Sequence, residues 1–365
     1  MVDLGAGEAV PTAAQIDEKK IEQACALLEK AARPMIVIGG GTQHASREIK
    51  ALAEKLNAPV VANHMGLGVL DSRHPLSFNF LGGVFLWEET DVVIAIGTRL
   101  MQQADFGFAG KKIVRIDIDE DQIGKPVAAD VASPGDAATM TQALTNALSG
   151  KRGAGWETAT FDKVRRKVAQ QCATLGPQVA YTEAIRDALP EHGIFVDEVT
   201  QMGHVSRLLF PVYQPRTYLT PAYQGTLGWG YATALGAQAA CPDTPVISIS
   251  GDGGFMFNVQ ELATAAQHRL PVVSIVFNDN AFGNVRRIQE QRFGNRLIAS
   301  DLTNPDFVAL GKSFGVASSR VTSPEELRRA LDAALAQRVP HLIEVPIGPM
   351  PDPWPILKAT PASKL

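Results

Sequence analysis

Apolar residues along the chain switch repeatedly between a helical and a strand-like pattern. Residues 21–28 carry apolar side chains at helical spacing, and residues 35–38 form a short apolar run typical of a buried strand. A glycine turn at residues 39–41 leads into a second helical pattern over residues 49–56. Further strands are predicted at residues 60–62, 91–96 and 113–118. This alternation predicts a parallel sheet covered by helices on both faces.

The same alternation restarts in the second half of the chain. Residues 149–155 combine small residues with two charges, which is typical of a linker. Beyond them, helices are predicted at residues 182–189, 230–240 and 259–268, and strands at residues 194–196, 246–250 and 272–277. A chain of 365 residues also suits two domains of roughly 100–200 residues each. We therefore predict an α/β protein of two three-layer parallel-sheet domains, at residues 1–150 and 156–365.

The composition of the chain limits the kinds of molecule that it is expected to bind and the compartment in which it is expected to lie. Hydrophobic residues make up 45% of the chain and charged residues 20%, which suits a globular protein with a sizeable core. The net charge of −4 gives no basic surface for nucleic acid. Three scattered cysteines without a Cys-x-x-Cys pair argue against disulfides or a thiolate metal site, and predict a cytoplasmic protein. No signal peptide pattern or apolar stretch of roughly 18 residues is found, so no membrane association is expected.

The strand predicted at residues 246–250 runs directly into Gly251, Asp252, Gly253 and Gly254. Open α/β sheets bind ligands at the carboxyl ends of their strands. Glycines there let the backbone N–H groups approach a phosphate, whereas a carboxylate would be repelled by it unless a cation lay between them. The next strand ends in Asn278–Asp279–Asn280, which would supply a second carboxylate. This pattern predicts a magnesium ion and a phosphate group at one edge of the sheet.

Gly251–Asp252–Gly253, followed 26 positions after Asp252 by Asn278–Asp279–Asn280, resembles the signature of thiamine diphosphate (ThDP) dependent enzymes. Residues 258–264 and the pair Phe282–Gly283 are similar to the acetolactate synthase branch of that family. The alternative is that both turns merely connect strands to helices.

The resemblance implies a role for each matching position. Mg²⁺ would bind the side chains of Asp252 and Asp279 and the carbonyl of Ala281, and the N–H groups of Gly253 and Gly254 would face the diphosphate. The family more often has asparagine at the position of Asp279, so we expect a stricter metal dependence here. Leu227 would prop the cofactor in a bent conformation, with ordinary core packing as the alternative. The remaining cofactor contacts implied are Gln201, Gly225, Thr226, Gly251, Asn278, Phe282 and Gly283.

Residues 116–119 and 122–125 are similar to the central domain of the same family, and residues 97–99 resemble a dinucleotide contact. Some relatives bind FAD in that domain and others leave it without a cofactor, so FAD is one of two expectations. Relatives also have an N-terminal domain with the glutamate that activates the cofactor, and residues 1–15 resemble the approach to the central domain. The sequence therefore predicts no catalytic residue of that kind within this chain.

Two functional readings follow from this resemblance. The chain is a fragment or split subunit of an acetolactate synthase-like enzyme that decarboxylates or ligates a 2-oxo acid, or it binds ThDP without catalysis. Ile288 stands where acetolactate synthases place a tryptophan, so a 2-oxo acid decarboxylase that does not make acetolactate is also considered. Arg286 or Arg287 would meet an acidic substrate, or else would lie on a solvated helix face.

The expected partners are a second copy, giving a dimer or tetramer, or a polypeptide that carries the pyrimidine domain. A nicotinamide-dependent oxidoreductase would need Gly-x-Gly-x-x-Gly, which neither glycine turn supplies. A scaffolding module would bind no ligand through a metal.

Overall fold

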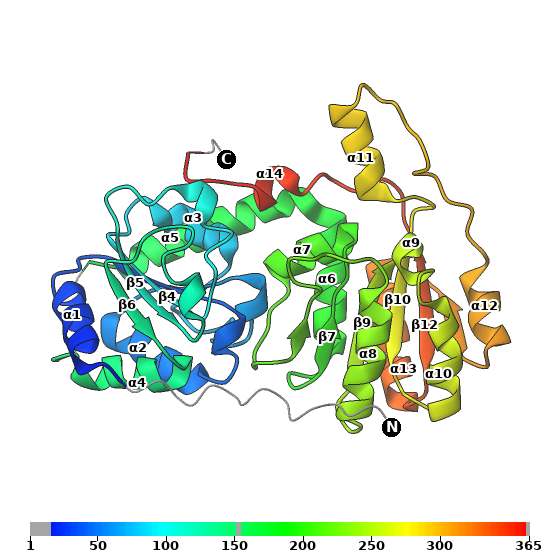
Figure 1. Cartoon of the computed structure of the whole chain (residues 1–365). Coiled ribbons are helices and arrows are strands. Elements are labelled where there is room, and N and C mark those ends of the chain that lie inside the picture. Colours follow the sequence, from blue (N-terminus) through cyan, green and yellow to red (C-terminus); the bar gives the residue numbers. More distant parts are fainter. Residues whose placement is uncertain (1–15, 151–154, 363–365) are drawn as a thin grey trace. The chain divides into compact units, whose positions relative to one another are not determined.

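The computed structural model describes residues 16–150 and 155–362, which form two compact units (Figure 1). The first unit contains most residues up to Val164, and the second contains Arg165–Ala359 together with Asp71–Arg73. The N-terminal approach at residues 1–15 lies outside the described residues, and so do residues 151–154 of the predicted linker.

The first unit is built on a six-stranded sheet with the order β3-β2-β1-β4-β5-β6, in which all neighbouring strands are parallel. Every residue of β1 and β4 is buried, so both faces of the sheet centre are covered. The strands are β1 (Pro34–Ile38), β2 (Val60–Ala62), β3 (Ser77–Phe78), β4 (Val92–Ile96), β5 (Lys112–Asp117) and β6 (Val131–Pro134).

Amphipathic helices cover this sheet. In α2 the buried residues Ile49, Leu52, Ala53 and Leu56 recur at helical spacing, and α2 packs against α4 while α3 packs against β2. The helices are α1 (Glu18–Leu28), α2 (Ser46–Leu56), α3 (Phe80–Trp87), α4 (Ala137–Ala147) and α5 (Thr158–Cys172), which continues into the second unit. Short 3₁₀ turns lie at Gly40–Thr42, His64–Gly66, Ala104–Phe106 and Glu120–Gln122.

The second unit has its own six-stranded parallel sheet, with the order β11-β12-β10-β9-β7-β8. Its central strands β9 and β10 are mostly apolar and almost entirely buried, so both faces of the sheet centre are covered. The strands are β7 (Ile194–Val196), β8 (Tyr218–Leu219), β9 (Val246–Gly251), β10 (Val273–Asn278), β11 (Ala317–Arg320) and β12 (His341–Pro346). Two parallel α/β sheets confirm the predicted fold class.

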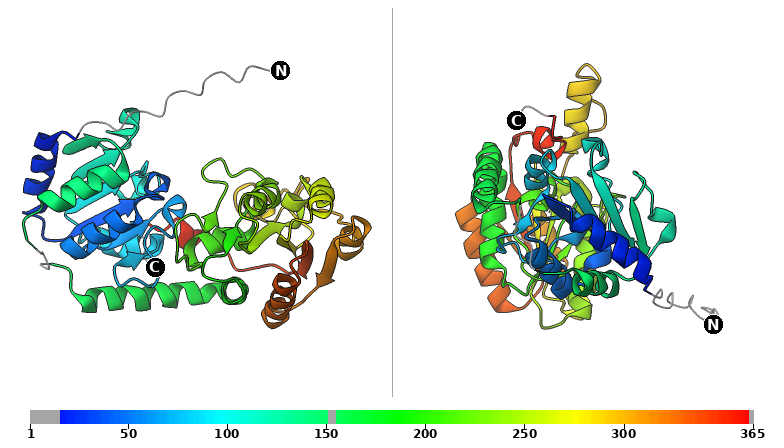
Figure 2. Two further views of the ribbon diagram at one scale, coloured as in Figure 1. Left: turned by 90° about the horizontal axis from the view of Figure 1, so that it is seen from below. Right: turned by 90° about the vertical axis from the view of Figure 1, so that its left-hand side faces the viewer.

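Helices flank both faces of this second sheet (Figure 2, left). On one face, Tyr231 and Leu235 of α8 and Leu262 of α10 share a core with Val246 and Val276. On the other face α6 packs against α13, and Tyr181 of α6 meets Phe277 edge to face. The helices are α6 (Gly176–Ala188), α7 (Gln201–Leu209), α8 (Trp229–Ala240), α9 (Asp252–Phe255), α10 (Leu262–His268), α11 (Gly283–Arg292), α12 (Phe307–Ser313), α13 (Pro324–Gln337) and α14 (Trp354–Leu357). Short 3₁₀ turns precede α6 at Ala173–Leu175 and α10 at Val259–Glu261.

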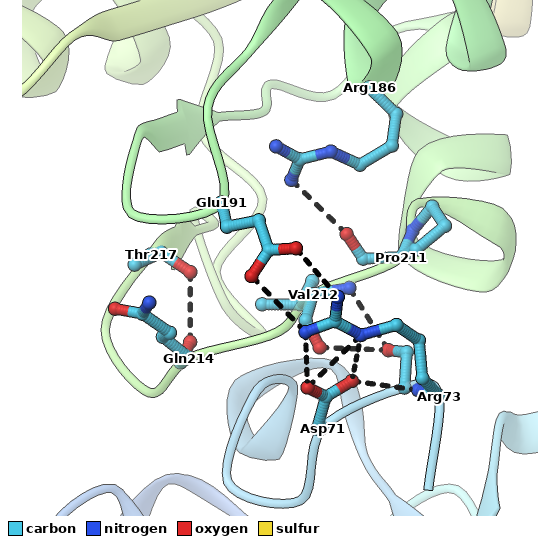
Figure 3. A network of polar contacts seen from close by, with 9 residues as sticks. Asp71, Arg73, Arg186, Glu191, Pro211, Val212, Gln214 and Thr217 are labelled. Carbon is cyan, nitrogen blue, oxygen red and sulfur yellow. Dashed lines mark hydrogen bonds and ion pairs between the residues drawn. The ribbon is translucent and has the colours of Figure 1, made fainter.

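The short segment Asp71–Arg73 joins the second unit through polar contacts (Figure 3). Arg73 forms ion pairs with Asp71 at 2.7 Å and with Glu191 at 2.6 Å. The hydroxyl of Ser72 donates to the carbonyl of Val212 at 2.9 Å. These contacts tie a segment far away in the sequence to the loops that precede β7 and β8.

Within the described part of the chain, no helix combines the length and the apolar character needed to cross a membrane.

Candidate functional site

The site begins where β9 ends. Strand β9 runs to Gly251, and α9 starts at Asp252 without an intervening loop, so Asp252 lies at the carboxyl end of the sheet. A Cβ atom on Gly253 would lie 2.4 Å from the ring of Phe282, and one on Gly254 would lie 2.7 Å from Oε1 of Glu198. Both glycines are therefore required by close packing around this turn as well as by the approach of any ligand.

Strand β10 brings the second carboxylate to the same edge. It runs parallel to β9, with Phe277 paired to Gly251, so the turn after Asn278 lies beside Asp252 as the sequence predicts. The side chain of Asn278 is buried and donates to Oε1 of Glu344 at 2.8 Å. Asn278 therefore fixes the end of the strand, and Asp279 is the next side chain along the turn.

Asp252 and Asp279 converge in a poorly solvated position. Asp252 is 1% exposed, and burial raises its pKa. Burial, together with the negative charge of Asp252, raises the pKa of Asp279 to about 6. Two adjacent carboxylates without a compensating cation are unfavourable, so the pair suits a divalent cation.

The donor set also fits magnesium better than zinc. Among the described residues, no group of three or more His, Cys, Asp or Glu side chains is placed to hold a metal ion. Magnesium is usually bound by only one or two protein carboxylates, with phosphate and water oxygens completing its coordination. The residues present therefore fit a magnesium ion shared with a phosphorylated ligand.

Asn304 belongs to this site, and sequence reasoning missed it. Its side-chain amide donates to Oδ2 of Asp252 at 2.6 Å, to Oδ1 of Asn278 at 2.9 Å and to Oδ1 of Asn280 at 3.3 Å. Asn304 lies in the loop between α11 and α12, far from any strand end, so no local pattern pointed to it. It holds together the oxygen atoms that follow β9 and β10.

A cavity of about 250 Å³ opens beside the two carboxylates. Most of the predicted cofactor residues line this cavity; Thr226 and Asn278 do not, since Thr226 is exposed and Asn278 is buried behind the turn. The predicted residues in the lining are Gln201, Gly225, Leu227, Gly251, Asp252, Gly253, Gly254, Asp279, Ala281, Phe282 and Gly283. Val199, Thr200, Phe277, Asn284, Val285 and Ile347 complete it, and the sequence analysis did not single these out.

Glu198 is a second buried residue that the sequence analysis overlooked. Its carboxylate accepts hydrogen bonds from the backbone N–H of Gly228 and, at 2.5 Å, from the hydroxyl of Ser250. Burial raises its pKa. Gly228 adopts φ +79°, a left-handed conformation that glycine tolerates, and starts α8. Glu198 therefore connects the turn that carries Leu227 to strand β9.

Gln201 is the first residue of α7, and it reaches the metal-binding turn. Its Nε2 donates to Oδ2 of Asp279 at 2.6 Å, and its Oε1 accepts from Nη2 of Arg287 at 3.0 Å. The side chain of Arg286 is 42% exposed and pairs with Glu290 and Asp301, as expected for a solvated helix face. Arg287, in contrast, is 14% exposed and turns inward.

A second cavity, of about 390 Å³, adjoins the first. Four residues line both cavities, namely Gln201, Asp279, Ala281 and Gly283. Arg286 and Arg287 line only the second. The arginines there already have acidic or amide partners, so the lining of this cavity offers little uncompensated charge.

In the first unit, the glycine turn at residues 39–41 packs against the turn after β4. A Cβ on Gly39 would lie 2.6 Å from the carbonyl of Gly97, and one on Gly41 would lie 2.9 Å from the Cα of Gly97. Contact between the two turns accounts for these glycines without any ligand. Binding of FAD stays a prediction.

Comparison with known protein families matches both units. Residues 21–144 match the central domain of thiamine pyrophosphate enzymes, and residues 198–345 match their C-terminal TPP binding domain. Thiamine pyrophosphate is another name for thiamine diphosphate.

Individual relatives are similar over most of the chain. It is 33% identical over 355 residues to a probable acetolactate synthase large subunit from Methanocaldococcus jannaschii, covering 90% of this chain and 60% of that protein. It is 28% identical to the acetolactate synthase isozyme 1 large subunit of Escherichia coli, over 93% of this chain and 63% of that protein. A probable 2-ketoarginine decarboxylase from Pseudomonas aeruginosa is 32% identical, over 87% of this chain and 58% of that protein. The chain thus spans about 60% of the length of these relatives.

Proposed function

Because the chain belongs to the thiamine pyrophosphate enzymes, through their central and C-terminal domains, we propose that its second unit binds ThDP through Mg²⁺ and serves an acetolactate synthase-like reaction of a 2-oxo acid. The observation that carries the proposal is the convergence of Asp252 and Asp279 beside the cavity at the ends of β9 and β10. A protein without such a ligand would have no use for two adjacent buried carboxylates.

Each part of the cavity has a role in this proposal. The side chains of Asp252 and Asp279 and the carbonyl of Ala281 hold Mg²⁺, and the backbone N–H groups of Gly253 and Gly254 face the diphosphate. Leu227, which lines the same cavity, supports the thiazolium end of the cofactor and keeps water from it. When bound, ThDP supplies a carbon nucleophile that adds to the carbonyl of a 2-oxo acid and accepts the electron pair released as carbon dioxide leaves.

In this proposal the described residues bind and orient the cofactor and shield it from water. We propose that the activating glutamate comes from a pyrimidine-type domain. That domain and a second copy of the chain are the proposed partners, in a dimer or tetramer. The relatives include both a synthase and a decarboxylase by name. A 2-oxo acid decarboxylase that makes no acetolactate is therefore the second candidate, and Ile288 in place of the family's tryptophan favours it.

Calorimetric titration of the chain with ThDP, with Mg²⁺ present or chelated, tests the binding proposal. We expect ThDP binding only with Mg²⁺, and we expect Asp252→Asn to weaken it at least about tenfold, the usual order for losing one metal ligand or its support. Asp332→Asn is the control, because Asp332 is half-exposed on α13 and pairs only with Arg328 among the ion pairs described. Equal binding with and without Mg²⁺, or none at all, would refute the proposal.

The reaction is tested separately by adding a pyrimidine-type domain from a relative and following the loss of pyruvate and the formation of acetolactate. Pyruvate loss with acetolactate supports the synthase-like activity, and carbon dioxide release without acetolactate supports the decarboxylase. Bound ThDP with no turnover on any 2-oxo acid would leave a binding protein without catalysis.

A further inference from the structure

Three elements of the second unit meet at the metal-binding turn. Asp279 follows β10, Gln201 begins α7, and Arg287 lies one turn into α11. Nη2 of Arg287 donates to Oε1 of Gln201 at 3.0 Å, and Nε2 of Gln201 donates to Oδ2 of Asp279 at 2.6 Å. The amide of Gln201 thus links the guanidinium of Arg287 to the carboxylate of Asp279. No hydrogen bond described joins Arg287 to Asp279 directly.

This chain of hydrogen bonds lies largely out of solvent. Gln201 is 8% exposed, and the side chain of Arg287 is 14% exposed. Arg287 is itself held, because Nη2 also donates to the carbonyl of Met350 at 3.2 Å and Nη1 lies 3.7 Å from Oδ1 of Asp352. A buried and anchored guanidinium has a defined position, so it can impose an orientation on its neighbour.

The direction of the amide follows from donor and acceptor chemistry. A guanidinium has only donors, whereas a glutamine amide has an acceptor at one end and donors at the other. Within the amide of Gln201, Arg287 can therefore donate only to Oε1. This contact turns Nε2 of Gln201 toward Asp279. In the reversed orientation an amide oxygen would face the carboxylate and N–H groups would face the guanidinium, and both contacts would be repulsive.

We propose that Arg287 is a positioning residue for the metal site: it fixes the amide of Gln201, which in turn orients the carboxylate of Asp279 toward Mg²⁺. The inference rests on the proposed function and assigns Arg287 to metal binding rather than to a substrate. The neighbouring Arg286 has no such contact, since it pairs with Glu290 and with Asp301 on the exposed side of α11.

The test is the Mg²⁺ concentration that half-saturates ThDP binding, measured by calorimetry on the full chain. We expect Arg287→Met to raise it by about 10- to 100-fold, the range found when an outer contact of a metal ligand is lost. Arg287→Lys should recover part of the loss, because an ammonium group also has only donors. Arg286→Met is the matched control on the same helix and should change the value by less than about twofold.

Repeating the Arg287→Met substitution in an Asp279→Asn variant distinguishes a positioning role of Arg287 from a merely structural one. In Asp279→Asn the side chain is a neutral amide that pairs with Gln201 in either orientation, so Arg287→Met should then have little effect. An equal loss in both backgrounds would show that Arg287 acts by holding residues 350–352, and it would overturn the inference. An unchanged half-saturating Mg²⁺ concentration in Arg287→Met would overturn it as well. If the unsubstituted chain binds no ThDP, the proposed function fails, and not only the role of Arg287.

Discussion

At the scale of single residues, Gly283 shows how little space the metal-binding turn leaves. A Cβ there would lie 2.6 Å from Oδ2 of Asp279 and 2.8 Å from Nε2 of Gln201. We predict that Gly283→Ala displaces both groups and weakens Mg²⁺-dependent ThDP binding by at least about tenfold, which calorimetry would measure.

Gly236→Ala is the matched control, because Gly236 lies within α8 and no atom is found within 4 Å of a Cβ placed there. Alanine is favoured over glycine inside a helix by roughly 0.5–1 kcal/mol, so this variant should unfold at a slightly higher temperature and bind ThDP normally. Normal Mg²⁺ dependence in Gly283→Ala would show that the turn is less tightly packed than the structure indicates.

His204 predicts a pH dependence of stability. Burial, with the positive charges of Arg207 and Arg287, lowers its pKa to about 4, and its ring packs against Trp354. The unfolded state takes up a proton near pH 6.5 and the folded state only near pH 4, so stability is lost as the pH falls through that window. We expect this residue to lower the free energy of unfolding by about 2 kcal/mol between pH 7 and pH 5.

Urea unfolding of the chain and of His204→Gln at both pH values would measure this contribution. The variant should lose less stability than the unsubstituted chain over the same interval, because it has no imidazole to protonate. Equal losses in the two proteins would mean that other groups account for the acid sensitivity.

The residues of the site could be predicted from the sequence only where a local pattern placed them at the end of a strand. Asp252 and Asp279 each follow an apolar strand, and parallel neighbours end at the same edge, so sequence alone brought them together. Asn304 and Glu198 reach the same region through contacts 52 residues away in sequence, with Asp252 and Ser250 respectively. No local pattern encodes such contacts, and only the folded chain reveals them.

At the scale of secondary structure, the strands were predicted best. The strand at residues 194–196 is reproduced in full, and those at 246–250 and 272–277 differ from β9 and β10 by one residue at an end or at both. The helix predicted at 259–268 begins instead with a 3₁₀ turn, and α10 starts at Leu262. The bounds of α11 were not predicted, and a helix there was considered only as a solvated face carrying Arg286 and Arg287. None of its residues is fully buried, and an exposed helix has no apolar stripe.

Because no residue of α11 is fully buried, its position depends on polar contacts, one of which lies at its first turn. Nε1 of Trp354 donates to Oδ1 of Asn284 at 2.8 Å. We predict that Trp354→Phe keeps an aromatic ring beside His204 but loses this hydrogen bond, at a cost of about 1 kcal/mol. Amide hydrogen exchange should speed up in α11, and ThDP affinity should fall by about fivefold, the factor equivalent to that energy.

Trp156→Phe is the control for the loss of an indole hydrogen bond, because Trp156 donates to the carbonyl of Pro34 in the first unit. It should leave exchange in α11 unchanged. If α11 exchanges at the same rate in Trp354→Phe as in the unsubstituted chain, then Trp354 does not anchor the helix.

At the scale of the whole molecule, two α/β units were predictable because the alternation of helix and strand patterns stops and restarts. Their boundary was harder to place. The contacts divide the chain between Val164 and Arg165, inside α5, whereas small residues and charges drew the sequence prediction to residues 149–155. A helix that continues from one unit into the next carries no turn residues to mark the division, so the proposed limits at 150 and 156 stay a prediction.

The two units lead to a prediction for thermal unfolding. A ligand that binds only the folded state stabilises the unit that holds it, by about 2.7 kcal/mol at a concentration 100 times its Kd. We expect two transitions in scanning calorimetry, of which ThDP with Mg²⁺ shifts only one to a higher temperature. Tryptophan fluorescence assigns them, since Trp87 and Trp156 lie in the first unit and Trp229 and Trp354 in the second. A Trp229→Phe/Trp354→Phe variant should keep only the unshifted transition in fluorescence. A single transition that ThDP with Mg²⁺ shifts as a whole would mean that the units unfold together.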